Sequence, residues 1–312
     1  DPYTEDAKEK IRKACNAPEA EVFLLVGGTQ TNATVIDALL KSYQGVVAAD
    51  TGHIATHESG AIEFGGHKVL TVPQKDGKIS AQQIEKLMKD FYDDANYEHM
   101  VMPGMVYISQ PTEYGTLYSR EELAVLSKVC RENHLPLYVD GARLAYALAS
   151  PENDVTLTDL AELCDVFYIG GTKCGALFGE AVVIPQKGRI PHFFTIIKQH
   201  GALLAKGRIA GIQFGELFTD GLYQRIGKPA MEAAEQIKAA LKKYGYQLSL
   251  DTPTNQIFCI VSNEVMKKIA QDVEFGFWEK YDETHSVIRF ATSWATTMED
   301  TQKLIQILEK NK

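Results

Sequence analysis

The feature that most constrains the fold is a regular alternation of short apolar runs with amphipathic segments of helical periodicity. The apolar runs lie at 21–26, 45–50, 105–110, 135–140, 166–170 and 179–185. Between them, Ser80 and Ser119 each precede a segment with apolar residues at helical spacing, and we expect both serines to cap helices. Strands that alternate with helices predict an α/β architecture, in which a mostly parallel sheet is covered on both faces.

The character of the sequence changes beyond about residue 190, where helical runs dominate and strand-like runs become fewer. Runs at 254–262 and 286–294 look like strands of a second, smaller sheet. We therefore expect a large domain of residues 1–210 and a small C-terminal α+β domain of residues 211–312. The sequence starts at Asp1 directly in a helix-like pattern, and we expect that an N-terminal arm is absent from it.

Charge and composition argue against several classes of protein. Forty-one acidic residues against 32 basic ones give a net charge of −9, which disfavours binding to nucleic acid or to anionic membranes. No apolar run is long enough for a transmembrane helix. The five cysteines are scattered and contain no C-x-x-C pair, so we expect reduced thiols and a cytoplasmic location.

Four places just after predicted strands carry residues with chemical potential. The first is GGTQTN, in which Gly28 and Thr29 lie between a strand and a helix. Small residues let backbone N–H groups approach a ligand, and a helix N-terminus favours an anion. The segment lacks the features of a Walker loop and of a G-x-G-x-x-G fingerprint. It is either a phosphate-binding turn or a strand-to-helix turn that simply requires glycine.

The second place is VDGARL, where Asp140 ends a strand that should be buried and Arg143 follows three residues later. These two side chains could form an internal ion pair. Alternatively, Asp140 could hold a protonated heterocyclic nitrogen through a charge-assisted hydrogen bond.

The third place is GGTKCG, a glycine-rich turn between two apolar strands that contains Lys173. Most lysines are solvated surface residues. The small and apolar flanks of Lys173 suggest desolvation, which weakens the hold of an ammonium group on its proton. A neutral amine is what condensation with an aldehyde requires.

The fourth place is a segment with three histidines, His53, His57 and His67, close to Glu58. Histidines and glutamates at this spacing could bind a metal, but the H-E-x-x-H pattern is absent and the glycines favour a loop over a helix, so no metal is expected. His53 could instead lie flat against an aromatic cofactor, or it could be a structural histidine.

Together, a phosphate-binding turn, an acid for a ring nitrogen, a lysine for an aldehyde and a ring for stacking meet the requirements of pyridoxal 5′-phosphate (PLP). The chain resembles the fold-type I PLP-dependent enzymes, and among them the threonine aldolase and β-eliminating lyase group. The resemblance rests on five motifs in order, namely GGTQTN, HIATHESGA, VDGARL, GGTKCG and IRFATSW. It implies a fold-type I PLP-dependent transferase-like architecture.

The resemblance also implies how the coenzyme is held. Lys173 would bind its aldehyde covalently, Asp140 would bind the pyridinium nitrogen, and His53 would stack on the ring. Gly28 and Thr29 would bind the phosphate.

Substrate binding follows from the same resemblance. Arg143, beside the coenzyme, and Arg289 would take the substrate carboxylate, and His53 is the favoured base for the substrate hydroxyl. Lys206 would reach a phosphate from the neighbouring subunit of a homodimer or homotetramer, or it is an exposed helix lysine.

Two residues depart from the pattern of many threonine aldolases. Glu113 in PTEYGTLY stands where those enzymes have a histidine that contacts the substrate hydroxyl, and Ser293 in ATSW replaces a more usual histidine. An ionised carboxylate accepts hydrogen bonds but does not donate them. We expect Glu113 to contact the substrate, and the threo/erythro preference stays open.

The activity that the resemblance implies is retro-aldol cleavage of L-threonine or L-allo-threonine, a β-hydroxy amino acid, to glycine and acetaldehyde. Two alternatives stay open. One is a PLP-dependent β-eliminating lyase or aminotransferase that acts on another amino acid. The other is a non-catalytic sensor that binds PLP or an amino acid.

Overall fold

The larger part of the protein is built around a seven-stranded sheet. The computed structural model describes all residues from 1 to 312. The strands lie side by side in the order β1-β7-β6-β5-β4-β2-β3. Their bounds are β1 Glu21–Leu25, β2 Gln44–Ala49, β3 Val69–Val72, β4 Met102–Ser109, β5 Leu137–Asp140, β6 Val166–Gly170 and β7 Glu180–Ile184.

Strands β2 to β6 run parallel to one another, and β7 is antiparallel to both of its neighbours, β6 and β1. The prediction of a mostly parallel sheet is therefore confirmed. Because the parallel strands share one direction, the residues that follow β2, β4, β5 and β6 come together at one edge of the sheet.

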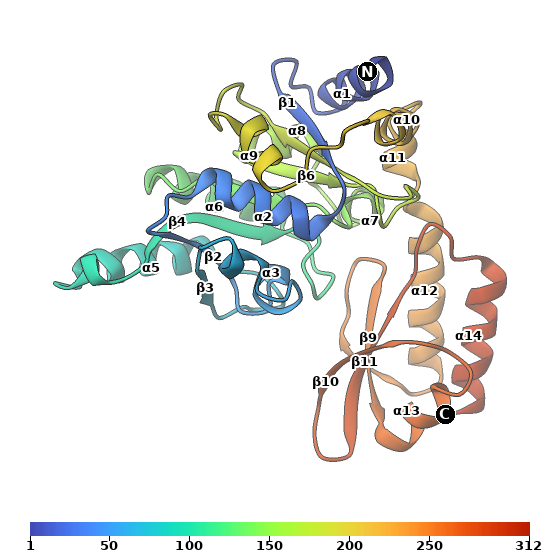
Figure 1. Ribbon diagram of the computed structural model, residues 1–312. Helices are drawn as coiled ribbons and strands as arrows, with labels where there is room; N and C mark the ends of the chain where they lie inside the picture. The colour runs from blue at the N-terminus through green and yellow to red at the C-terminus, as the bar shows by residue number, and fades with distance from the viewer.

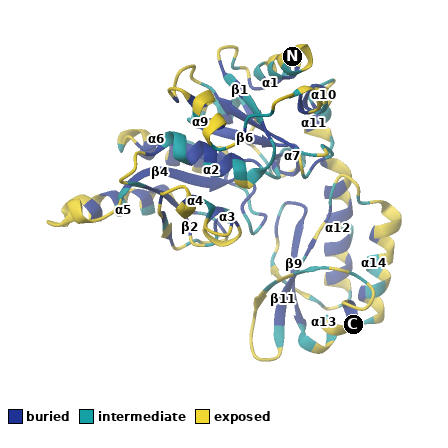
Figure 2. Ribbon diagram, in the orientation of Figure 1, coloured by how far each residue is buried: buried dark blue, intermediate teal, exposed yellow.

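Helices cover both faces of this sheet (Figure 1). Alternate residues of the strands supply two apolar cores, as the pleat requires. One core packs against α2 and α9, and the other against α1, α5 to α8 and α10. The bounds of these helices are α1 Pro2–Ala14, α2 Gly28–Leu39, α5 Ala81–Asp93, α6 Arg120–Glu132, α7 Leu144–Ala149, α8 Leu157–Leu163, α9 Phe193–Gln199 and α10 Arg208–Leu217. Figure 2 shows that the strands of this sheet are mostly buried, since they are drawn in dark blue.

The two predicted helix caps are confirmed. Ser80 accepts a hydrogen bond from the backbone of Gln83 at the start of α5, and the Gln83 side chain bonds back to Ser80. Ser119 and Glu122 form the same reciprocal pair at the start of α6. Each pair satisfies two N–H groups that would otherwise have no partner at the helix start, and this stabilises the first turn of α5 and of α6.

A second sheet of four strands, in the order β10-β11-β9-β8, forms a separate layer near the C-terminus (Figure 1). Its strands are antiparallel and pack on α12, α13 and α14 through an apolar core of their own. The bounds are α12 Lys228–Lys243, β8 Gln247–Leu250, β9 Gln256–Ser262, α13 Asn263–Ile269, β10 Gly276–Lys280, β11 His285–Ala291 and α14 Met298–Lys310. The short helix α11, Leu222–Arg225, leads into α12. The domain division at residue 210 stays a prediction; that residue lies inside α10, which packs against α1.

One segment differs from expectation. The histidine-rich segment is not a simple loop, because it contains two single-turn helices, α3 at His53–Thr56 and α4 at Ala61–Phe64, bounded by glycines. In the region where helical runs were expected, the run from 193 to 217 forms two helices, α9 and α10. It is broken at Gly201, whose φ of +62° is left-handed backbone that favours glycine.

A one-turn 3-10 helix at Tyr97–His99 follows α5. None of the helices is long and apolar enough to cross a membrane.

Candidate active site

A cavity of about 310 Å³ opens at the edge of the large sheet where the parallel strands end. Its walls come from the start of α2 and from the segments after β2, β4, β5 and β6. Seven of the residues predicted from sequence line it: Gly28, Thr29, His53, Glu113, Asp140, Arg143 and Lys173. Arg289 and Lys206 are not among the lining residues.

Asp140, which ends β5, is buried and accepts four hydrogen bonds. Its Oδ1 accepts from the Tyr168 hydroxyl at 2.5 Å and from the backbone N–H of Ala142 at 2.9 Å. Its Oδ2 accepts from the Tyr107 hydroxyl at 2.7 Å and from Asn32 Nδ2 at 3.1 Å. All four partners donate, so the hydrogen bonds stabilise negative charge on this carboxylate.

Arg143 does not form the internal ion pair with Asp140 that was one reading of the VDGARL motif. Its guanidinium lines the cavity, it takes part in none of the salt bridges of the protein, and burial lowers its pKa. A largely desolvated cation without a carboxylate partner favours an anionic ligand, because unpaired buried charge is costly. Arg143 is therefore suited to bind a carboxylate in the cavity.

Lys173 lies in the turn after β6 and reaches the same cavity. Burial and the positive charge of Arg143 lower its pKa from 10.5 to about 8. Because of this lowered pKa, a neutral fraction of the lysine amine is present near neutral pH, as nucleophilic attack on a carbonyl requires. In the neighbouring Glu180, burial and the charge of Asp140 raise the pKa to about 7.

His53, the first residue of α3, is oriented by a buried carboxylate. Its Nδ1 lies 2.8 Å from Glu58 Oε1, which also accepts from Asn32 Nδ2 at 2.8 Å. Because a carboxylate accepts, the proton sits on Nδ1 and leaves Nε2 as an acceptor. The other oxygen, Glu58 Oε2, is buried without any hydrogen-bond partner. Because the Glu58 side chain has no exposed surface, its role is to orient His53 and Asn32.

Glu113 lies in the loop after β4, opposite His53. Its Oε1 accepts from Ser109 Oγ at 2.6 Å and from the His53 backbone N–H at 2.9 Å. Burial raises its pKa, and the charge of Asp140 adds to that effect. Both of these bonds use Oε1, so Oε2 is the atom that remains for a ligand in the cavity.

The start of α2 forms part of the cavity wall through Gly27, Gly28 and Thr29. Gly27 is its N-cap residue and no side chain caps the helix, so its first N–H groups have no partner within the helix. A Cβ atom at Gly27 would meet no atom within 4 Å, which leaves the approach to these N–H groups open. Such a helix start favours phosphate.

The donor set fits PLP. An uncapped helix start suits its phosphate, an ionised buried carboxylate suits its ring nitrogen, and an amine with a lowered pKa suits its aldehyde. The open space at Gly27 lies in the lining of this cavity.

Arg289 and Lys206 lie elsewhere. Arg289 is on β11, where it donates to Gln256 Oε1 at 3.2 Å, packs over Trp278, and lines a different cavity in the small sheet region. Its charge still acts on Lys173, whose pKa it lowers. Lys206 precedes α10 and is not a helix lysine.

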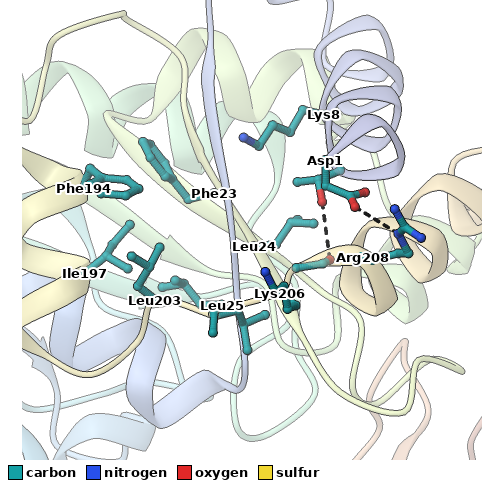
Figure 3. A pocket seen from close by; sticks show the side chains of 14 residues that line it. Asp1, Lys8, Phe23, Leu24, Leu25, Phe194, Ile197, Leu203, Lys206 and Arg208 are labelled. Carbon is teal, nitrogen blue, oxygen red and sulfur yellow. Dashed lines mark hydrogen bonds and ion pairs between the residues drawn. The ribbon is translucent and has the colours of Figure 1, made fainter.

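Lys206 lines a separate cavity of about 690 Å³ between α1, β1 and α10. Figure 3 shows Asp1, Lys8 and Arg208 on one side of it, and Phe194, Ile197 and Leu203 on the other. Lys206 therefore does not line its own chain's active-site cavity, and its expected contact with a phosphate of the neighbouring subunit stays a prediction.

Several residues of the site escaped the sequence analysis. Glu180, Asn32, Tyr107 and Tyr168 were not singled out, and Glu58 was considered only as a metal ligand. The tyrosines read as ordinary core aromatics of apolar strands. The usable signal was the polar Asn32 among apolar positions of a buried helix, and the charged Glu180 at the start of an apolar strand.

Comparison with known proteins gives a consistent result. A family model described as beta-eliminating lyase matches residues 1–264. The low specificity L-threonine aldolase of Pseudomonas sp. (strain NCIMB 10558) is 31% identical over 95% of this chain and 84% of its own length.

Solved structures agree with that assignment. A threonine aldolase of Leishmania major has 40% sequence identity and a TM-score of 0.94, and the match covers 99% of this chain and 89% of that one. An aspartate aminotransferase mutant of Thermus thermophilus, at 16% identity, has a TM-score of 0.70 over 100% of this chain and 86% of that one. The second match supports the fold alone, and that fold is the predicted fold-type I architecture.

Proposed function

The chain belongs to the beta-eliminating lyase family, and from that premise we propose that it is a PLP-dependent aldolase that cleaves L-threonine or L-allo-threonine to glycine and acetaldehyde. The observation that carries the proposal is the meeting of three groups in one cavity. These are the Lys173 amine with its lowered pKa, the buried carboxylate of Asp140 and the unpaired guanidinium of Arg143.

Three parts of the cavity would hold the coenzyme. Lys173 would bind the aldehyde, Asp140 the ring nitrogen, and Gly28 and Thr29 at the start of α2 the phosphate. When bound, PLP supplies an electron sink that stabilises negative charge on the α-carbon of an amino acid.

The chain's own residues then decide which bond breaks. Arg143 binds the substrate carboxylate with its planar fork of donors, and this fixes the rotation of the amino acid about its α-carbon. A fixed rotation places one bond of the α-carbon in the reactive orientation, which is how positioning contributes to rate.

Cleavage of the Cα–Cβ bond also needs an acceptor for the hydroxyl proton. His53 Nε2 is free to accept, because Glu58 holds the ring in the Nδ1–H form. Glu113 faces the same space with a raised pKa, which brings a carboxylate closer to the range suited to general base catalysis. We assign the proton to His53 and hydrogen bonding of the hydroxyl to Glu113.

The glutamine variant Glu113→Gln tests the second assignment. Its side-chain oxygen can still accept from Ser109 and His53, so the loop should keep its structure. We expect kcat/KM for threonine to fall about tenfold to a hundredfold, because the hydroxyl loses an anionic acceptor. The ratio of threonine to allo-threonine turnover should change, while coenzyme binding should not. Unchanged kinetics with both substrates would remove Glu113 from the substrate site.

Product analysis tests the function itself. The purified protein with PLP should convert threonine or allo-threonine to equal amounts of glycine and acetaldehyde, identified by mass spectrometry. Ammonia together with a keto acid would instead indicate elimination, which Glu113 and Ser293 motivate as an alternative, and a new amino acid from an added keto acid would indicate transamination. Coenzyme binding without turnover of any amino acid would indicate a sensor.

The pKa of Lys173 predicts how coenzyme uptake depends on pH. Only the neutral amine reacts, so the uptake rate should rise up to about pH 8 and then level off. Lowering the pKa from 10.5 to about 8 should increase the neutral fraction at neutral pH roughly 300-fold. Apo-protein mixed with PLP at a series of pH values, followed by visible absorbance, measures this. The control is the reaction of PLP with Nα-acetyl-lysine, which has a free ε-amine; its rate should continue to rise above about pH 8. The same continued rise in the protein would contradict the lowered pKa of Lys173.

We also propose that the protein is a homodimer or a homotetramer. Exposed apolar side chains gather on α1, on the turn after Lys173 and on α10, which are in contact with one another. They are Tyr3, Leu177, Ile209 and Ile212. Such a patch is typical of an interface, and it adjoins Thr4 and Arg208 of the cavity that contains Lys206. In the oligomer Lys206 would reach the partner's coenzyme phosphate.

Light scattering tests the oligomer. The native protein should have two or four times the chain mass of 34.6 kDa, and Ile212→Glu should lower the mass to that of one chain. Val125→Glu, at an equally exposed apolar position on α6, is the control and should not change the mass. A wild-type protein of single-chain mass would disprove the assignment.

A further inference from the structure

Three tyrosines lie next to one another on adjacent strands under the cavity, and all three are fully buried. Tyr107 is on β4, Tyr138 on β5 and Tyr168 on β6. Their rings share the face of the sheet that packs against α2. Apolar residues would fill this space at lower cost, because each buried hydroxyl needs a partner.

Two of these hydroxyls converge on one carboxylate. Tyr107 donates to Oδ2 of Asp140 and Tyr168 donates to Oδ1, so each carboxylate oxygen receives a phenol from a flanking strand. Tyr138 differs, because it donates to Asn32 Oδ1 at 2.8 Å and does not touch Asp140. The two phenols remain donors, since burial and the charge of Asp140 raise the pKa of both well above its usual value.

The four hydrogen bonds that Asp140 accepts oppose its protonation. With the bonds from Asn32 and from the Ala142 backbone, four donors occupy the four lone-pair positions of the carboxylate. A proton on either oxygen would have to displace the N–H donor on that oxygen or turn the tyrosine hydroxyl there from donor to acceptor. The bond from Asn32, at 3.1 Å, is the longest of the four, so it is the one that a further donor would most readily replace.

We propose that Tyr107 and Tyr168 are positioning residues that keep Asp140 ionised against a bound cationic ring, so that the shared proton stays on the ring nitrogen. A buried pair of a carboxylate and a pyridinium can instead become neutral by moving that proton to the carboxylate, and low polarity favours the neutral form. Donated hydrogen bonds stabilise the negative charge and oppose the transfer. The inference rests on the proposed PLP-dependent function.

Other ionisable groups face this network and do not replace the phenols. Glu58 and Glu113 are negative when ionised, Arg143 and Lys173 are positive, and Glu180 has a pKa of about 7. None of them is hydrogen bonded to Asp140. The two tyrosines are thus the only side-chain hydroxyls that contact the carboxylate directly.

The test is ¹⁵N NMR of the holoenzyme loaded with PLP that is labelled at the ring nitrogen. The wild-type signal should be that of a protonated ring. The single variants Tyr107→Phe and Tyr168→Phe, each of which removes one oxygen atom, should shift it toward the neutral pyridine position, and the double variant should shift it further. We expect kcat to fall roughly tenfold to a hundredfold for each bond lost, as is usual for hydrogen bonds to a charged group.

Tyr138→Phe is the matched control, because it removes a hydroxyl of the same burial from the same layer but leaves both phenol bonds to Asp140. Its ring-nitrogen signal should stay in the protonated position. The single variants keep the test decisive even where the double variant does not fold.

Two results would overturn the assignment. If both single variants bind PLP and keep a protonated ring, the tyrosines do not control the proton, while the proposed function stands. If the wild-type protein takes up no PLP, the proposed function fails, and this assignment fails with it.

Discussion

Replacing Lys173 by alanine should abolish covalent coenzyme binding and reduce turnover by at least about a thousandfold. The amine lies at the cavity that also contains Asp140 and Arg143, and its lowered pKa leaves part of it neutral near pH 7. Alanine removes the only nucleophilic amine at this cavity. The measurements are the visible absorption spectrum after dialysis, borohydride trapping followed by peptide mass spectrometry, and kcat with threonine.

The matched control is Lys267→Ala, which removes an exposed lysine from α13 in the other sheet region. It should keep the visible band and full turnover. If the Lys173 variant kept a stable visible band after dialysis, or if trapping placed the coenzyme on another lysine, the assignment of Lys173 would be wrong.

Much of this site could be predicted because the chemistry follows strand ends in the sequence. Gly28, His53, Asp140 and Lys173 each come just after an apolar run. Parallel strands bring such positions to one edge, so local patterns in sequence translate directly into proximity in space. The caps at Ser80 and Ser119 were predictable for a related reason, since each is a contact between residues three positions apart.

Contacts between distant segments were harder to predict. Tyr107, Tyr138 and Tyr168 are normal residues for buried strands, and only the strand register shows that two of them meet Asp140. The same holds for Asn32 and Glu58, which are 26 positions apart. The separation of Lys206 from the cavity also depends on tertiary packing, which periodicity does not report.

The direction of β7 follows from the length of the connection that leads into it. Only nine residues separate the end of β6 from the start of β7. A parallel crossover needs about a dozen residues or more, so this connection requires an antiparallel β7. The turn is also the one that contains Lys173, and the reversal of direction brings Glu180 at the start of β7 back to the cavity. Connection length would thus have predicted a carboxylate beside the lysine.

The second large effect is expected from Asp140→Asn, which keeps the shape of the side chain and removes its charge. We expect kcat to fall by about a hundredfold to ten-thousandfold, because a neutral amide does not hold a protonated ring nitrogen and the electron sink weakens. The visible band should persist, since Lys173 is intact. Steady-state kinetics, the absorption spectrum and the ¹⁵N signal of the ring nitrogen measure these effects separately.

Folding must be separated from chemistry in that variant. The amide NH₂ group of asparagine would face donors such as Tyr107 or Tyr168, so we expect the free energy of unfolding to fall by about 1–3 kcal/mol. Asp165→Asn is the matched control, because Asp165 accepts from the backbone of Leu137 at the other end of β5 and pairs with Arg189. It should show a similar loss of stability in urea unfolding with unchanged kcat. If both variants lost activity in proportion to stability, Asp140 would be a structural residue, because a carboxylate that controls the ring charge must reduce kcat in protein that is fully folded.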